Sequence, residues 1–149
     1  MENVELTNMC MIRNQTGQVV VQLRKKKDWP GLTFPGGHVL PNESFHDSVI
    51  REVLEETGLT ITKPLLCGVK QFQLANGGRY IVLFYHTDSW EGSLKGSSEG
   101  EVFWVDPQNF QDYSLAPDFL EMYQVFISDH LSEFFYQKNP DKEWTIQLY

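Results

Sequence analysis

The sequence lacks the features that mark secreted, membrane and disulfide-stabilised proteins. It has two cysteines, Cys10 and Cys67, which are too few for a disulfide scaffold or a zinc knuckle, so we expect two reduced thiols in the core. No run of about 18 apolar residues occurs, and the first seven residues contain two glutamates without a basic or apolar leader. We therefore expect no membrane span and no secretion, and predict a cytoplasmic protein.

Positive charge is also scarce. The 149 residues include 12 Lys and Arg against 20 Asp and Glu, a net charge of −8. This balance disfavours a protein that binds a nucleic-acid polymer, because such binding relies on basic residues that contact phosphates. A small anionic ligand stays compatible with it, since a divalent cation can lie between acidic side chains and phosphates.

The chain shows no repeat, linker or low-complexity tract, and its length predicts a single domain over residues 1–149. No G-x-G-x-x-G motif follows a strand, which disfavours a doubly wound nucleotide-binding fold. The turn at 14–17 predicts a hairpin of strands 7–12 and 18–23, and 76–78 predicts a second hairpin of strands 65–74 and 79–87. A further short strand is expected at 101–105.

Two helices are expected among these strands. The first covers 44–57, with Ser44 as N-cap and Gly58 just past its end, and the second runs from Pro117 to about Tyr136. Strands mixed with two helices, without regular alternation, predict an α+β fold in which helices pack on a mixed sheet.

The first predicted helix combines an apolar stripe with a carboxylate stripe. Its apolar stripe consists of Val49, Ile50, Val53 and Leu54. Glu52, Glu55 and Glu56 stand at i, i+3 and i+4, so their side chains are neighbours that repel one another. Such residues are most often an exposed, solvated helix face. The alternative is a site for a hard divalent cation, which takes oxygen ligands and relieves the repulsion.

Residues 37–59 resemble the Nudix box, G-x5-E-x7-R-E-U-x-E-E-x-G-U with U aliphatic. Every defined position of the box is filled: Gly37, Glu43, Arg51, Glu52, Val53, Glu55, Glu56, Gly58 and Leu59. The resemblance implies the Nudix α/β/α sandwich. It also implies an enzyme that hydrolyses phosphoanhydride bonds of a nucleoside diphosphate linked to another group.

The resemblance implies roles for the box residues. Glu52, Glu55 and Glu56, with the carbonyl of Gly37, correspond to ligands of Mg²⁺ or Mn²⁺, and one of the glutamates can instead activate the attacking water. Arg51 corresponds to the residue that fixes a box glutamate, and Glu43 to the one that supports the loop before the helix. Gly36 and Gly37 allow the backbone to approach the metal and substrate closely.

Residues outside the box are further candidates. The family often has another glutamate ligand downstream, and we favour Glu99 over Glu101 because Glu101 begins an alternating strand. Arg24 resembles the basic residue that meets substrate phosphates in MutT-like relatives, with membership of the solvated run 24–27 as the alternative.

The stretch 29–37, WPGLTFPGG, is similar to that of MutT-type enzymes, which convert oxidised purine nucleotides such as 8-oxo-dGTP to the monophosphate and pyrophosphate. Asp118 stands where those relatives contact the base, although a helix-start carboxylate is the alternative. Phe34 and Phe72 are expected either to stack a base or to lie in the core. His38 departs from the lysine common at that position.

Other activities stay open at this stage. The substrate can be another nucleoside diphosphate derivative, such as ADP-ribose, a nucleotide sugar or a pterin triphosphate. The subfamily markers for ADP-ribose and dinucleoside polyphosphates are not evident near Ala75 and Asn76. A non-catalytic nucleotide sensor is less favoured, because all box glutamates are present. The aromatic-rich segment 134–149 could serve a homodimer contact.

Overall fold

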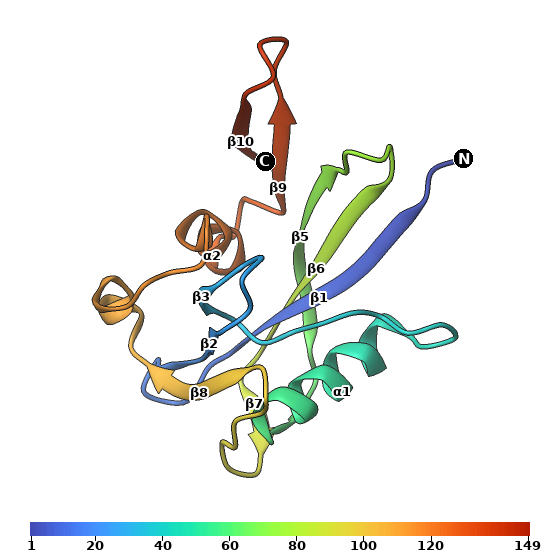
Figure 1. Ribbon diagram of the computed structural model, residues 1–149. Coiled ribbons are helices and arrows are strands. Elements are labelled where there is room, and N and C mark those ends of the chain that lie inside the picture. The colour runs from blue at the N-terminus through green and yellow to red at the C-terminus, as the bar shows by residue number, and fades with distance from the viewer.

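The computed structural model describes residues 1–149 and has strands between two α-helices (Figure 1). In chain order its elements are β1 (Val4–Ile12), β2 (Val19–Arg24), β3 (Gly31–Thr33), α1 (Phe45–Thr57), β4 (Thr60–Thr62), β5 (Leu65–Gln73), β6 (Arg79–Thr87), β7 (Ser89–Glu91), β8 (Gly100–Val105), the 3-10 helix η1 (Pro107–Asp112), α2 (Phe119–Ile127), β9 (Glu133–Lys138) and β10 (Trp144–Leu148).

Three sheets organise the strands. The largest has the order β1-β6-β5-β9-β10, the second β3-β2-β8, and the third pairs β4 with β7. The β5–β6 hairpin is antiparallel, as predicted, whereas β1 runs parallel to β6 and β9 runs parallel to β5. The largest sheet is therefore mixed, and the predicted α+β class is confirmed.

The predicted hairpin of strands 7–12 and 18–23 is wrong. The Asn14 side chain accepts hydrogen bonds from the backbone of Thr16 and Gln18, so the turn itself forms. Beyond it the strands share only the bridge between Arg13 and Val19. β1 pairs with β6 over nine positions and β2 pairs with β3 and β8, because both strands are buried on two faces and find longer partners elsewhere.

Alternate residues of β1 enter two cores, one on each face. Met9 and Met11 pack in a core that includes α2, whereas Cys10 and Ile12 pack in a core that includes Val49 and Val53 of α1. The helices therefore cover opposite faces of the strands, the α/β/α arrangement expected from the sequence. Cys10 and Cys67 are both free thiols, as predicted.

α1 matches the predicted helix closely at both ends. The Ser44 hydroxyl accepts a hydrogen bond from the Asp47 N–H at 2.9 Å, and Gly58 ends the helix in the left-handed conformation with φ of 79°. The predicted apolar stripe was too broad, because Leu54 is 48% exposed while Glu56 is only 5% exposed. The buried face of α1 therefore includes Glu56 as well as Val49 and Val53.

The second helix is shorter than predicted. α2 ends at Ile127, and the remaining residues form the β9–β10 hairpin. The Ser128 hydroxyl accepts hydrogen bonds from the backbone of His130 and Leu131, which turns the chain away from the helix. β9 then pairs with β5, so tertiary pairing overrides the helical spacing of the apolar residues. No helix is long and apolar enough to cross a membrane.

Candidate active site

The loop before α1 holds the two box carboxylates nearest the sheet. The Gly36 N–H donates a hydrogen bond to Glu56 Oε2 at 3.1 Å. A Cβ at Gly37 would overlap the Glu52 carboxylate, and one at Gly36 would overlap the Asn8 carbonyl. Gly36 therefore needs to be glycine for the loop to fit against β1, whereas a side chain at position 37 would displace the Glu52 carboxylate. Glu52 is half-buried, Glu55 is exposed and Glu56 is buried.

Arg51 ties the loop to the glutamates of its own helix. Its guanidinium donates to both Glu43 oxygens at 2.6 and 2.9 Å, to Glu52 at 2.9 Å and to Glu55 at 3.1 Å. It also donates to the carbonyl of His38 at 2.9 Å. Glu43 in turn accepts from the Leu40 N–H. Arg51 is thus placed to orient the carboxylates, which agrees with the role the resemblance implies.

Glu99 lies beside Glu56, although the two are far apart in sequence. They share a side-chain hydrogen bond, and Lys26 Nζ is 3.2 Å from Glu99 Oε1. Burial, together with Glu99 and Glu52, raises the pKa of Glu56 to about 8, and burial also raises the pKa of Glu52. The bond to Glu56 and the ammonium of Lys26 lower the pKa of Glu99. We name Glu52, Glu56 and Glu99 the carboxylate cluster.

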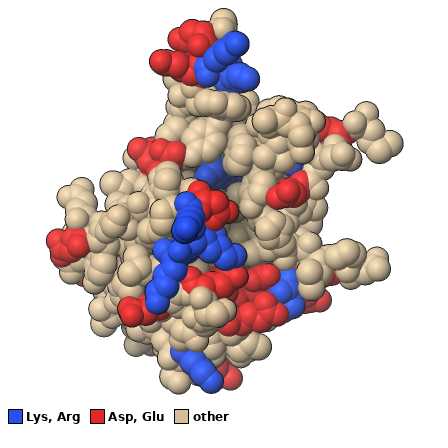
Figure 2. Space-filling view, viewed as in Figure 1, with Lys and Arg blue, Asp and Glu red and all other residues tan.

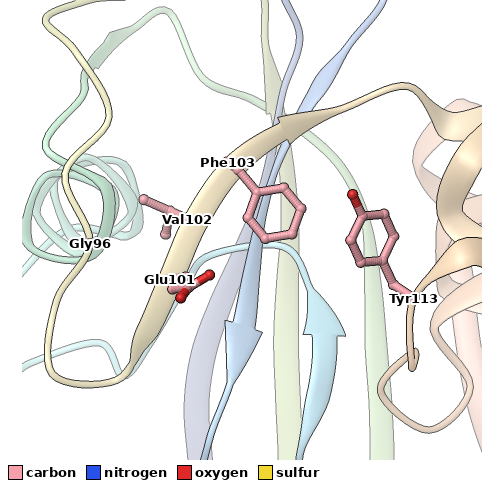
Figure 3. Close-up of a pocket in the computed structure, with 5 residues that line it drawn as sticks. All are labelled: Gly96, Glu101, Val102, Phe103 and Tyr113. Carbon is pink, nitrogen blue, oxygen red and sulfur yellow. The ribbon is translucent and has the colours of Figure 1, made fainter.

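Glu101 points elsewhere. With Gly96, Val102, Phe103 and Tyr113 it lines a cavity of about 520 Å³ beside β8 (Figure 3). The rings of Phe103 and Tyr113 face each other there, with centroids 5.3 Å apart. Of the two downstream candidates, only Glu99 perturbs the pKa values of Glu52 and Glu56. This geometry favours Glu99 as the downstream ligand.

The carboxylate cluster suits a hard divalent cation in its chemistry. As the side chains stand, no three acidic, imidazole or thiol groups converge closely enough to hold a metal. Arg51 is paired with Glu52, and Lys26 is paired with Glu99. The donors are all oxygens, and their mutual repulsion is what a cation relieves. The Gly37 carbonyl accepts from the Asn8 N–H at 2.8 Å and keeps a second lone pair for a ligand. The chemistry of these donors therefore fits such a cation.

Arg24 lies between the carboxylate cluster and the aromatic side of the molecule. It ends β2 opposite Gly100, the neighbour of Glu99, and its positive charge helps lower the pKa of Glu99. Its Nε is buried without a hydrogen-bond partner, and its guanidinium lies 5.5 Å from the Trp29 ring centre. This is unlike a freely solvated arginine. Figure 2 shows basic side chains next to a dense acidic group on this face.

Asp118 does not cap α2. It occupies the N-cap position with a left-handed φ of 63°, yet its side chain makes no capping hydrogen bond. Instead its carboxylate accepts a hydrogen bond from the hydroxyl of Tyr136. Asp118 therefore stands at the helix start, as the alternative expects, but the hydrogen bond of its side chain is to Tyr136 and not to a helix N–H.

The two candidate stacking residues differ. Phe34 is 2% exposed and packs edge-on against Phe119 and Phe126, each at 5.0 Å between centroids. The expectation that it stacks a base is corrected here, because neither face of its ring is free. Phe72 is half-buried, stacks on Tyr80 at 5.2 Å and meets Tyr136 edge-to-face at 5.4 Å between centroids, so it keeps some exposure that Phe34 lacks.

Sequence reasoning missed Lys26, Lys70 and Tyr136. Tyr136 was assigned to a helix, and its place on β9 depends on long-range pairing with β5. Lys70 could have been noticed, because strand alternation puts it on the same face of β5 as Phe72, opposite to Gln71 and Gln73. Lys26 gave no signal that separated it from its basic neighbours.

A comparison with protein-family models matches the NUDIX domain over residues 6–126. The curated relatives include the CTP pyrophosphohydrolase of Escherichia coli, 28% identical over 80% of this chain and 90% of that protein. They also include the putative 8-oxo-dGTP diphosphatase of Bacillus subtilis, 30% identical over 65% of this chain and 63% of that protein. Among solved structures, the Mutator MutT protein of Bacillus halodurans superimposes with a TM-score of 0.75 at 26% identity, covering 97% of both chains.

Proposed function

This chain belongs to the Nudix family of hydrolases, which act on phosphoanhydride bonds, and we propose that its substrate is a nucleoside triphosphate. The products would be the nucleoside monophosphate and pyrophosphate. Oxidised purine nucleotides such as 8-oxo-dGTP are the proposed preferred class. The MutT-type stretch at 29–37 and the relative named for 8-oxo-dGTP support this choice.

The observation that carries the proposal is the carboxylate cluster beside Arg24. Glu52 and Glu56 come from α1 and Glu99 from the loop before β8, so the fold assembles them from distant segments. Arg24 and Lys26 border the cluster and provide positive charge for phosphates. An exposed solvated helix face would not bury Glu56 or join it to a glutamate of another segment.

The residues divide the work of hydrolysis as follows. A divalent cation, when bound, lowers the pKa of water and neutralises phosphate charge. The carboxylate cluster and the Gly37 carbonyl would hold that cation, while Arg51 orients Glu52 and Glu55. Arg24 would bind substrate phosphates. The water oxygen forms a bond to phosphorus, the anhydride P–O bond breaks, and the proton passes to a carboxylate of the site.

A second candidate substrate is CTP. The relative named as a CTP pyrophosphohydrolase is matched over 90% of its length, more than the relative named for 8-oxo-dGTP. Both substrates would undergo the same chemistry in the same carboxylate cluster, so they differ only at the base and at the 2′ position of the sugar.

The experiment is a substrate panel with product identification. Nucleoside triphosphates, including 8-oxo-dGTP, dGTP and CTP, are compared with ADP-ribose by kcat/KM in Mg²⁺. The proposal expects monophosphate and pyrophosphate, with the highest kcat/KM for an oxidised or unmodified purine triphosphate. Preferred turnover of ADP-ribose, or nucleotide binding without turnover in Mg²⁺ or Mn²⁺, would contradict it.

A further inference from the structure

Lys70 is a buried cation without an oxygen partner. It lies on β5, is 6% exposed, and its only hydrogen-bond contact is with Met122 Sδ at 3.6 Å. Burying an ammonium without compensating hydrogen bonds is costly. A lysine with a purely structural role would be expected to reach a carboxylate or carbonyl, and this one does not.

Aromatic rings surround the ammonium. Its Nζ lies 5.0 to 5.8 Å from the ring centres of Trp29, Phe72, Phe134 and Tyr136. These distances allow cation–π attraction, which holds the charge in place. Burial lowers the pKa of Lys70 to about 8, opposed by the nearby Asp118 carboxylate, so the ammonium form predominates at pH 7. An ammonium has three N–H donors, and the only contact that uses one of them is the long one to Met122 Sδ, so donors remain for a ligand.

The side chains around Lys70 are fully buried on one side and partly exposed on the other. Lys70, Met122 and Phe134 are buried, whereas Trp29, Phe72, Tyr80, Asp118 and Tyr136 are only half-buried. Figure 2 shows basic atoms in a recess below the β9–β10 hairpin. A flat, largely apolar molecule with a polar edge matches such surroundings, and nucleobases are of this kind.

The position of Lys70 relative to the carboxylate cluster fits a nucleotide. Two cations lie near the Trp29 ring, with Arg24 at 5.5 Å and Lys70 at 5.3 Å from its centre. Arg24 in turn acts on the charge of Glu99. Arg24 and Trp29 therefore connect the neighbourhood of the carboxylate cluster with that of Lys70. A nucleotide with its phosphates at the cluster and its base at Lys70 would use both neighbourhoods.

We propose that Lys70 is a specificity-determining residue that donates a hydrogen bond to a carbonyl oxygen of the nucleobase. It would favour guanine, 8-oxoguanine and other oxo-bearing bases over adenine, which has no carbonyl oxygen. In adenine an amino group replaces the 6-oxo group, and it would meet the ammonium donor to donor. Asp118 and Tyr136 would complete the polar edge. This inference rests on the proposed function, because that function places a nucleotide here.

The test uses two nucleotides that differ chiefly at the atom in question. Hypoxanthine carries oxygen at position 6 and a proton on N1, where adenine carries an amino group and a lone pair. dIMP and dAMP therefore differ only at these two adjoining positions, and the Lys70 variants separate the contribution of the carbonyl. Their dissociation constants are measured by calorimetry without metal, together with that of dGMP. A charge-assisted hydrogen bond predicts that wild type binds dIMP and dGMP about 10-fold or more tighter than dAMP.

Three variants accompany wild type. Lys70→Met keeps the length and apolar packing of the side chain and removes the donors. The ratio of the dissociation constant of dAMP to that of dIMP or dGMP should therefore fall toward one, while the binding of dAMP changes little. Lys70→Gln keeps a neutral donor and should restore part of the preference. Lys138→Met removes an exposed lysine on β9 and should behave as wild type. Thermal unfolding checks that each variant folds. If Lys70→Met does not fold, the nucleotide preference of Lys70→Gln still tests the proposal.

If Lys70→Met weakens the binding of dIMP, dGMP and dAMP by the same factor, Lys70 acts in phosphate binding or in folding. That result would overturn the proposal. A preference that persists in this variant, or one that is absent from wild type, would also overturn it. Failure of the proposed function gives a different result. In that case wild type would hydrolyse no nucleoside triphosphate in Mg²⁺, whatever its preference among monophosphates.

Discussion

Glu56 has the most unusual environment among the site residues. It lies on the buried side of α1, accepts a hydrogen bond from the Gly36 N–H and shares another with Glu99. The sequence predicted a carboxylate stripe but not that one member would be buried and another, Glu55, exposed. The difference depends on where the loop and β8 pack against the helix, which spacing within the helix cannot reveal.

Arg51 is expected to stabilise the fold as well as the site. Replacing it with Met removes bonds to Glu43, Glu52 and Glu55, and leaves Glu43 without the partner that lowers its pKa to about 2. Urea unfolding should show a lower free energy of unfolding for Arg51→Met, because a network of several hydrogen-bonded charges is lost. The matched control is Arg13→Met, whose exposed pair with Asp88 is worth at most about 1 kcal/mol. Equal losses would contradict the assigned role of Arg51.

Lys70 should reduce stability at neutral pH. Because its pKa is lowered to about 8 in the folded protein and lies near 10.5 when unfolded, burial of the charged form opposes folding at low pH. Asp118 and Tyr136 face it from neighbouring elements, and Tyr136 stays neutral since burial raises its pKa further.

We therefore expect Lys70→Met to be more stable than wild type by about 1–3 kcal/mol at pH 7. As pH rises from 8 to 10.5, folded wild type loses the proton before the unfolded chain does, so wild type gains stability and the difference narrows. Urea unfolding across this pH range measures it. A difference that stays constant with pH would show that Lys70 is not held as a buried cation.

At the scale of elements, the reliable predictions were those set by local chemistry. α1 begins at its predicted cap and ends at its predicted glycine, and β5 and β6 form the predicted hairpin. The errors arose where partners lie far apart in sequence. β1 pairs with β6 and not with the predicted partner β2. The C-terminal segment forms β9 because it pairs with the edge of β5 that β6 leaves free. Consequently Tyr136 and Lys70 were not predicted as neighbours of Asp118.

The contact between the loop and α1 can be tested with one methyl group. Gly37→Ala places a Cβ where the Glu52 carboxylate lies, so Glu52 must move and kcat/KM should fall about 10-fold or more. Gly77→Ala is the control, because its turn leaves open space for a Cβ and lies away from the site. It should lose up to about 1 kcal/mol of stability through its positive φ, without loss of kcat/KM. Normal activity of Gly37→Ala would mean that Glu52 need not stay in place.

For the whole molecule, the net charge of −8 gains a local explanation. Part of the acidic excess is concentrated in the carboxylate cluster, at the junction of α1, the loop before it and the loop before β8. The same acidity that disfavours binding to a nucleic-acid polymer suits a nucleotide bridged by a divalent cation. The remaining charge serves solubility.

A cation that relieves this repulsion should stabilise the folded protein without substrate. We expect millimolar Mg²⁺ to raise the melting temperature of wild type, because it binds the folded state only. The increase should be smaller in Glu99→Gln, while Glu101→Gln should respond as wild type. Equal increases in all three proteins would place the cation elsewhere.

The most direct test of the central claim is the Mg²⁺-dependent kcat/KM of Glu56→Gln, measured by pyrophosphate release from the best nucleotide of the panel. Glutamine keeps the size of the side chain and removes its charge, and Glu101→Gln is the control on the neighbouring strand. The account predicts a fall of about 100-fold or more in Glu56→Gln and little change in Glu101→Gln. Full Mg²⁺-dependent activity in Glu56→Gln would contradict the assignment of the carboxylate cluster as the hydrolytic centre.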